Sequence, residues 1–342
     1  MKVYKLLFTF CFAISFNVLF SQSELILDNS NIQIGIDYKN EKYLVFNGFE
    51  DYYFRNFSDP KWNKKSYKSN ALPKSANFPF KYFHIKGKNY LVSNGCGEVY
   101  EFRNDSIIRI DNSFDHKNQF FSSSFVYNDE IYFFGGYGLF THKNIITKFD
   151  FKTKEWELIK YKDYKNVPEP RQKPLHFLDK DKLYIISGYT DNNDSDQVTG
   201  GSKLLNDIWV FNLKTRIWNK IGEINDKNIL IGLYDTSDSY QLNNNFYYDY
   251  NNIYRFNFES NTVSYSKHRN KYFTSRFEQI NIKSKDIIYG IKSSNESNNQ
   301  IKIVVEPFEK YLTPFEKSES LVINYNFWIG IGIISFVLCL LI

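Results

Sequence analysis

Cysteine is scarce in this chain of 342 residues, and its three copies are placed so that the main body has no pair to form a disulfide. Cys11 and Cys339 lie in apolar segments at the two ends, which leaves Cys96 alone between them. A fold cross-linked by intrachain disulfides is therefore excluded. The stability of the body must come from apolar packing and from hydrogen bonds between strands.

Alanine is also rare and occurs only at Ala13, Ala71 and Ala76. Aromatic residues, in contrast, make up 19% of the chain. Because aromatic and β-branched side chains pack well on a pleated sheet, this composition predicts an all-β body. Long helices are expected only at the two ends.

The chain lacks any long run of one charge. Its net charge of +5 results from 43 basic and 38 acidic residues spread along the sequence. No basic run of the kind that follows phosphates is present, so we expect no nucleic-acid partner. Motifs for a phosphate loop, a nucleophile elbow or a zinc site are absent, and no two histidines have the spacing of a metal pair.

Two apolar segments stand out at the ends. Residues 1–21 place Lys2 and Lys5 ahead of an apolar run, as a secretory signal does, and an uncleaved anchor is the alternative. Residues 321–342 carry no charge and are long enough to cross a bilayer as a helix. A buried core helix and a cleaved lipid-anchor signal are the alternatives there. The sequence thus predicts an exported body at residues 22–316, held by one membrane span, in a complete chain or in a fragment of a longer protein.

Two stretches of the body are copies of one unit. In each, a hydrophobic strand ends in glycine, at Gly136 or Gly188, and a later aromatic residue precedes Trp156 or Trp218 by seven positions. A strand ending in glycine, followed by two strands joined through a Lys-Thr turn, describes part of a four-stranded propeller blade. Weaker copies keep an apolar residue where tryptophan is lost, at Ile107 and Val263.

The glycine that ends the second strand of the unit marks the phase of the repeat. Asp249 takes its place in the fifth unit, and the other units carry Gly48, Gly95, Gly136, Gly188 and Gly290. These positions imply six units, with seven as the alternative. The alternating segment at residues 31–36 is expected to pair with the last sheet and so to close the ring.

The run from Asn206 through Trp209 to Trp218 resembles a kelch repeat, and the segment ending at Arg171 resembles the stretch that leads into such a blade. The resemblance is specific over residues 120–220 and only periodic elsewhere. It implies a six-bladed kelch-type β-propeller, similar to that of galactose oxidase. The chain also resembles the exported half of membrane-anchored bacterial kelch proteins.

The family resemblance has two limits. Kelch proteins usually carry a glycine pair such as Gly135–Gly136, whereas Gly95, Gly188 and Gly290 stand singly. Some relatives are copper oxidases and others are sugar epimerases, but neither a copper-binding set of Tyr and His nor a recognisable carboxylate pair is present. No cofactor and no catalytic residue are therefore expected.

The candidate ligand site is the mouth of the central channel, because propeller ligands usually meet the loops there. Arg171 precedes the first strand of the fourth unit, and Arg276 has nearly the same phase in the sixth. Two arginines could clamp a carboxylate or another anion, with His176 nearby. The alternative is that the guanidinium groups cap carbonyls of neighbouring blades and that His176 is structural.

An oxygen-rich insertion follows the second strand of the fourth unit. Asp191, Asn193, Asp194 and Asp196 could hold calcium, although the segment lacks the glycine and the distant glutamate of an EF-hand loop. A solvated loop has the same composition. By its length, the insertion is also a candidate for contact with a partner.

Three functions are compatible with this sequence. We favour a recognition module, sensory if a regulator follows, that binds an unknown protein or glycan outside the cytoplasmic membrane, because a signal and a span would fix the propeller to the bilayer. The second is an exported carbohydrate-active enzyme of the sialic acid epimerase type, with Arg171 and Arg276 on an acidic sugar. The third is an adhesion or structural surface protein.

Overall fold

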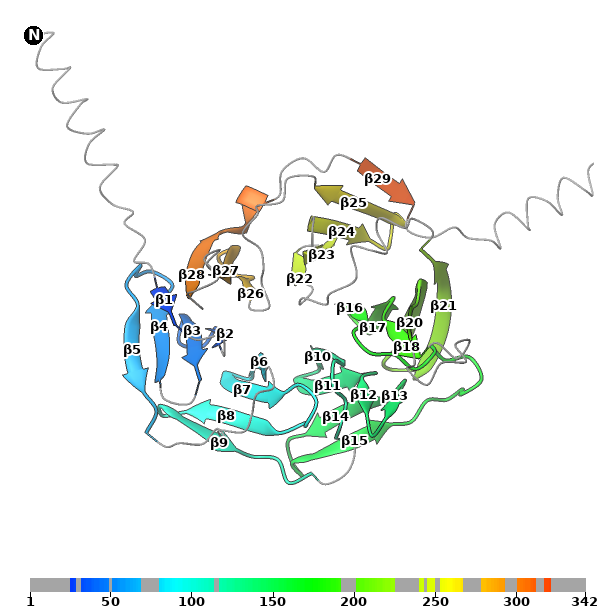
Figure 1. Cartoon of the computed structure of the whole chain (residues 1–342), viewed down its shortest axis with the longest axis horizontal. Helices are drawn as coiled ribbons and strands as arrows, with labels where there is room; N and C mark the ends of the chain where they lie inside the picture. Colours follow the sequence, from blue (N-terminus) through cyan, green and yellow to red (C-terminus); the bar gives the residue numbers. More distant parts are fainter. Residues whose placement is uncertain are drawn as a thin grey trace, which may run out of the picture.

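The computed structural model forms a ring of six radial sheets (Figure 1). It describes residues 25–28, 32–48, 51–68, 80–113, 117–191, 201–224, 240–242, 245–249, 253–266, 278–292, 300–311 and 317–320. Apart from one short 3-10 helix, η1 (Phe308–Tyr311), every regular element in these ranges is a strand. The predicted all-β propeller of six blades is confirmed.

The first four blades follow the chain from the centre of the ring outwards (Figure 1). The first contains β2 (Ile32–Asp37), β3 (Lys42–Asn47), β4 (Asp51–Asn56) and β5 (Asn63–Ser66). The second contains β6 (Phe80–Ile85), β7 (Lys88–Ser93), β8 (Val99–Arg103) and β9 (Ser106–Arg109). The third contains β10 (Ser123–Tyr127), β11 (Glu130–Phe134), β14 (Ile146–Asp150) and β15 (Glu155–Ile159). The fourth contains β16 (Leu175–Asp179), β17 (Lys182–Ile186), β20 (Asp207–Asn212) and β21 (Ile217–Glu223).

Two small hairpins and the last two blades complete the ring. The hairpins are β12 (Tyr137–Gly138) with β13 (Thr141–His142), and β18 (Tyr189–Asp191) with β19 (Ser202–Leu204). The fifth blade contains β22 (Tyr240–Leu242), β23 (Asn245–Asp249), β24 (Ile253–Asn257) and β25 (Thr262–Ser266), with β29 (Lys317–Ser320) added at its outer edge. The sixth contains β26 (Glu278–Asn281), β27 (Asp286–Lys292), β28 (Ile301–Pro307) and β1 (Leu25–Leu27).

The second strand of each of the first four blades is almost wholly apolar because it is covered on both faces. In β11 and β17, the four residues after the first are all buried. Each blade lies between two others, so alternation of polar and apolar residues is replaced by a continuous apolar run. These runs are the segments from which the repeat was recognised.

The outermost strands of the third and fourth blades hold their tryptophans against the preceding blade. Trp156 lies opposite Phe149 in its own blade and packs with Val92 of the second blade. Trp218 packs in the same way with Phe134 of the third blade, at 5.1 Å between ring centroids. Where tryptophan is lost, an apolar residue occupies the same register, as Ile107 does opposite Phe102 and Val263 opposite Phe256.

The ring is closed by β1 and not by the strand that the sequence suggested. Residues 32–37 form β2, which pairs with β3 inside the first blade. The strand that joins the last sheet is β1, whose Leu25 lies opposite Ile303 of β28. An N-terminal strand does close the ring, as predicted, but the predicted pairing of residues 31–36 with the last sheet was wrong. The closing strand β1 was not recognised because its three residues are too few to show alternation.

A further strand extends the fifth blade beyond the predicted end of the body at residue 316. After the sixth blade, β29 returns to the fifth and pairs with β25, with Ser320 opposite Thr262. The predicted signal at residues 1–21 and the predicted span at residues 321–342 lie outside the described ranges. Within those ranges, no helix has the length and apolar character needed to cross a membrane.

The role of β1 in closing the ring can be tested by two substitutions on neighbouring residues. Leu27 is 4% exposed and packs into the core between the first and sixth blades, whereas Ile26 is 51% exposed. We expect Leu27→Ala to lower the free energy of unfolding by about 2–4 kcal/mol, through lost burial and the cavity left behind. Ile26→Ala should change it by less than about 0.5 kcal/mol. Urea denaturation followed by circular dichroism measures both, and equal losses would contradict this assignment of faces.

Candidate functional site

The loops at one end of the third and fourth blades form the face with the most elaborate structure. Antiparallel strands alternate in direction, so the loop after the second strand and the segment entering the next blade lie at the same end. Here each of the two blades carries an extra hairpin, β12–β13 or β18–β19. Backbone bridges between Phe120 and Tyr137, and between Gln172 and Tyr189, bind each hairpin to the segment entering its blade. We call this end the hairpin face.

The glycines at this face allow the backbone segments to approach each other. Gly136 has a φ of +96°, and a Cβ atom there would lie 2.8 Å from the carbonyl carbon of Gln119. In the fourth blade the corresponding pair is Ser187–Gly188, and Ser187 has a φ of +56°. A serine therefore adopts the left-handed conformation of the missing first glycine, which explains why Gly188 stands singly.

Arg171 is fully buried in the segment that enters the fourth blade. Its Nη1 and Nη2 atoms donate to the two carboxylate oxygens of Asp207, at 2.5 and 2.9 Å. Nη1 also donates to the carbonyl of Ser187 and Nε to that of Glu169, both at 2.9 Å. The guanidinium thus caps carbonyls of loops that must meet at this face, which is the second of the two roles considered from the sequence.

Asp207 stays ionised in this setting. Burial raises the pKa of its carboxyl, but the hydrogen bonds and positive charge of Arg171 outweigh that effect and hold the pKa below its usual value. Trp209 adds a third donor, from Nε1 to Oδ2 at 2.6 Å. A bidentate pair of this kind fixes the geometry of both loops.

In the third blade, an uncharged side chain makes the corresponding hydrogen bonds between loops. Gln119 occupies the place of Arg171 and donates from Nε2 to the carbonyl of Gly135 at 2.9 Å. Its Oε1 accepts a hydrogen bond from Thr147 Oγ1 at 2.6 Å. The two blades therefore share one connection, which is neutral in the third and ionic in the fourth.

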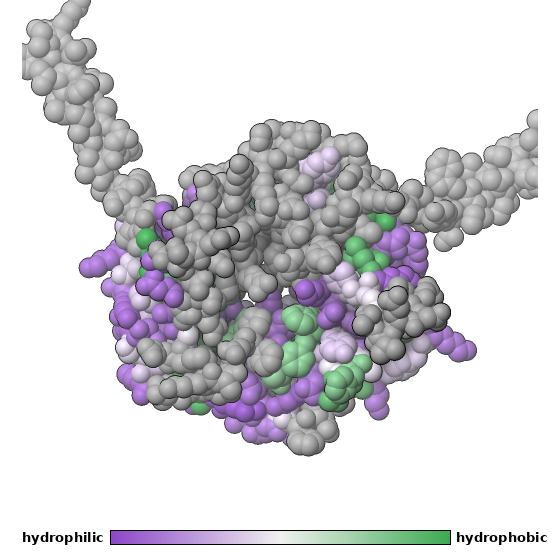
Figure 2. Space-filling model, in the orientation of Figure 1, coloured by the Kyte–Doolittle hydropathy of each residue, from purple (hydrophilic) through white to green (hydrophobic). Residues whose placement is uncertain are grey.

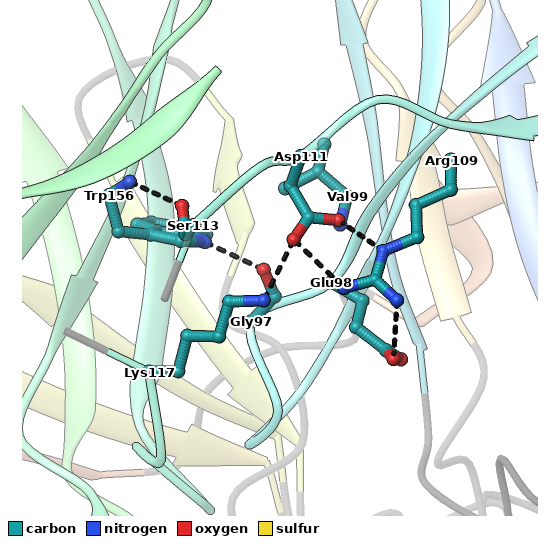
Figure 3. A network of polar contacts seen from close by, with 8 residues as sticks. All are labelled: Gly97, Glu98, Val99, Arg109, Asp111, Ser113, Lys117 and Trp156. Atoms are coloured by element: carbon teal, nitrogen blue, oxygen red, sulfur yellow. Dashed lines mark hydrogen bonds and ion pairs between the residues drawn. The ribbon is translucent and has the colours of Figure 1, made fainter. Parts of the chain in front are cut away.

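A second buried carboxylate joins the second and third blades (Figure 3). Asp111 accepts hydrogen bonds from Arg109 Nε at 2.9 Å, Lys117 Nζ at 2.8 Å and the backbone N–H of Val99 at 3.0 Å. Burial raises the pKa of Asp111, and these partners lower it further than burial raises it, so that it lies below its usual value. Close by, Trp156 Nε1 donates to the carbonyl of Gly97 at 2.7 Å (Figure 3). No motif in the sequence marks Asp111, so this network was not predicted.

The two hairpins of the face touch through a histidine and a carboxylate. The side chain of His142 in β13 is 5% exposed, and its Nδ1 lies 3.0 Å from Oδ2 of Asp191 in β18. The ring of His142 also packs edge-on against Tyr137, at 5.1 Å between centroids. This contact connects the third and fourth blades at the surface, above the buried connections.

The tip of the β12–β13 hairpin exposes two large apolar side chains. Leu139 is 73% exposed and Phe140 91% exposed. Both have left-handed backbone, with φ of +53° and +65°, a conformation that costs about 1 kcal/mol or more for such residues. Beside the hairpin, Phe121 is also exposed, with Lys173 Nζ 5.2 Å from its ring centroid. Figure 2 shows apolar surface over the region where β12 and β13 lie.

The other candidate binding residues predicted from the sequence are His176, Arg276 and the four proposed calcium ligands. His176 is the second residue of β16, half-buried, with its ring 6.0 Å from that of Phe125. Arg276 lies outside the described residues, so the pairing of the two arginines stays a prediction. Of the proposed calcium ligands, Asp191 contacts His142, and Asn193, Asp194 and Asp196 lie outside the described residues. Among the residues that are described, no three His, Cys, Asp or Glu side chains are grouped as metal ligands.

Comparison with known proteins supports the repeat assignment. Residues 98–229 match the family model described as the KLHDC2/KLHL20/DRC7 Kelch-repeats domain. This part of the chain is similar to a kelch-repeat domain. The match covers the stretch in which the sequence resemblance was most specific, so the recognition of kelch repeats is confirmed.

The propeller fold has a counterpart of known structure over most of the chain. A solved structure described as "Structure of YjhT" superposes with a TM-score of 0.57 at 10% sequence identity, covering 83% of this chain and 99% of that chain. At this identity the likeness shows the fold alone. The comparison with curated proteins found no match.

The buried ion pair makes a specific prediction for stability. Arg171→Met leaves Asp207 as a buried charge without its partner, so we expect the free energy of unfolding to fall by about 3–5 kcal/mol. The double variant Arg171→Met/Asp207→Asn removes that lone charge and should be more stable than the single variant. Arg109→Met is the control, because Lys117 still pairs with Asp111. A double variant no more stable than the single one in urea denaturation would contradict this role.

The ion pair should also make stability depend on pH. The pKa of Asp207 is lowered in the folded state, so its ionised form stabilises the fold above about pH 4, and this contribution is lost as the pH falls through the folded-state value. We expect Asp207→Asn to be less stable than the wild type at pH 7 and the difference to shrink towards pH 3. Denaturant titrations at both pH values measure it, and a constant difference would show that Asp207 does not titrate in this way.

Proposed function

We propose that this protein is a recognition module that binds a macromolecular partner through the hairpin face. The observation that carries the proposal is the tip of β12–β13, where Leu139 and Phe140 are exposed in left-handed backbone. Folding alone gains little from such a tip, whereas a partner would bury both side chains. Aromatic side chains such as that of Phe140 are enriched at protein interfaces relative to the rest of the surface.

The connections behind the tip support this function by holding it in place. A Cβ atom on Gly138 would lie 2.0 Å from the carbonyl oxygen of Asn118, so the hairpin lies directly on the segment entering its blade. The Gln119 and Arg171 connections fix the segments entering the third and fourth blades. A rigid support lowers the conformational entropy lost on binding.

Membrane tethering outside the cytoplasmic membrane is part of the same proposal. It rests on the sequence alone, on the signal-like residues 1–21 and the apolar residues 321–342. A tether would keep the recognition face at a fixed distance from the bilayer. The enzyme alternative gains no support from the described residues, since the guanidinium of Arg171 is enclosed by Asp207 and backbone carbonyls.

The recognition function can be tested by photo-cross-linking of the full-length chain in its own cells. A photoreactive phenylalanine analogue at position 140 should give a reproducible adduct with one partner. The same analogue at Ile282, which is 66% exposed in a turn at the opposite end of the blades, is the control. Leu139→Ser, placed beside the analogue, should weaken the adduct about tenfold or more. Labelling at position 140 no stronger than at 282 would contradict the proposal.

Tethering is tested separately by fractionation of the same cells. The full-length chain should stay with the membrane fraction after extraction at alkaline pH. It should become sensitive to added protease once the outer layers are opened but the cytoplasmic membrane is intact. Release into the alkaline extract, or protection from the protease, would contradict the proposed anchor or its orientation.

A further inference from the structure

A cavity of about 390 Å³ lies between the fourth and fifth blades, at the end of the ring opposite the hairpin face. It is bounded by the turn between β16 and β17 and by the turn between β24 and β25, together with residues of β17, β20 and β23. This volume is within the range of small-molecule sites. Because it lies at the other end of the blades, the cavity is independent of the recognition face.

The inner part of the cavity is aromatic and contains one free hydroxyl. Tyr184 and Phe258 stack with 3.9 Å between ring centroids and 7° between planes, and Phe246 lies beside them. Tyr184 is only 7% exposed, and its hydroxyl has no hydrogen-bond partner among the described residues. Because Tyr184 lines the cavity, a ligand or a water molecule there can supply a hydrogen bond to its hydroxyl.

Comparison with the third blade shows why the hydroxyl is free. There the equivalent tyrosine, Tyr132, donates its hydroxyl to Glu130 two residues earlier in the same strand, at 3.3 Å. In the fourth blade that earlier position is Lys182, which is exposed. The internal acceptor of the third blade has therefore been replaced by a residue that cannot accept a hydrogen bond.

Three carboxylates line the cavity, and the exposed Lys180 and Lys182 also border it. Asp181 is paired with Lys214 at 2.7 Å, which leaves one other carboxylate from each blade. Asp179 ends β16 and Glu259 lies in the turn after β24, and neither forms an ion pair within the described part of the chain. At the position of Glu259, the third and fourth blades carry Lys152 and Lys214. Burial raises the pKa of Tyr184, and the charges of Asp179 and Glu259 raise it further, so both carboxylates act at its hydroxyl.

We propose that this cavity binds a small organic cation. Its ammonium or guanidinium group would lie between the carboxylates of Asp179 and Glu259 and donate a hydrogen bond to the hydroxyl oxygen of Tyr184. Its apolar part would lie against Phe258 and Phe246. A cation close to carboxylates and aromatic faces is favoured by both ion pairing and cation–π attraction.

Binding is measured by saturation-transfer NMR on the full-length chain in detergent micelles, with benzylammonium, phenethylammonium and agmatine as probes. Benzyl alcohol, the neutral analogue of benzylammonium, is the matched control ligand. We expect saturable binding of at least one cation and about tenfold weaker binding of benzyl alcohol. Failure of all three cations to bind, or equal binding of the alcohol, would overturn the proposal.

Substitution of the two cavity carboxylates tests whether the cation binds in this cavity. Asp179→Asn and Glu259→Gln should each raise the Kd of the bound cation about tenfold, because each removes one charge and keeps the shape. Asp129→Asn is the control, since Asp129 lies in the corresponding turn of the third blade. Unchanged denaturation midpoints would show that the variants fold. Binding that survives both cavity substitutions would place the cation elsewhere and overturn the assignment.

Discussion

The ring depends on the hydrogen bonds between β1 and β28, which close it without a covalent link. The sixth blade takes three strands from one end of the body and one from the other, and β1 pairs with β28 over only three residues. Cys96 is a free thiol, so no disulfide supports this junction within the body. Apolar packing must do so instead, and Leu25 and Leu27 enter the same core as Ile34 and Ile303. The packing between the first and sixth blades therefore depends on this closing strand.

Within the ring, the blades use one plan with local substitutions. The tryptophans of the third and fourth blades give way to isoleucine and valine elsewhere, which retain burial at lower volume. Polar connections vary more freely, as the pairs Gln119–Thr147 and Arg171–Asp207 illustrate. A neutral and an ionic pair can hold equivalent loops because each satisfies the buried donors and acceptors that the fold places there. The repeat therefore constrains shape more strongly than it constrains charge.

The architecture was largely predictable because it rests on short-range patterns. The run Phe149 to Trp156 and its copies fix two adjacent strands and their register, and the recurring glycines locate the second strand of most blades. The site was less predictable. Arg171 and Asp207 are 36 residues apart, and Tyr184 and Glu259 line one cavity from neighbouring blades, so nothing in either local sequence reveals the partner. The left-handed Ser187 was also hidden, because it breaks the glycine pattern while preserving its backbone conformation.

The position of β29 has a mechanical consequence. Among the described strands it pairs with β25 alone, at the outer edge of the four-stranded fifth blade. Tension applied to the chain beyond residue 320 would act first on the ladder between these two strands. That short ladder would be separated before any load reached β28 and the closing strand, so β29 would act as a sacrificial link that spares the propeller.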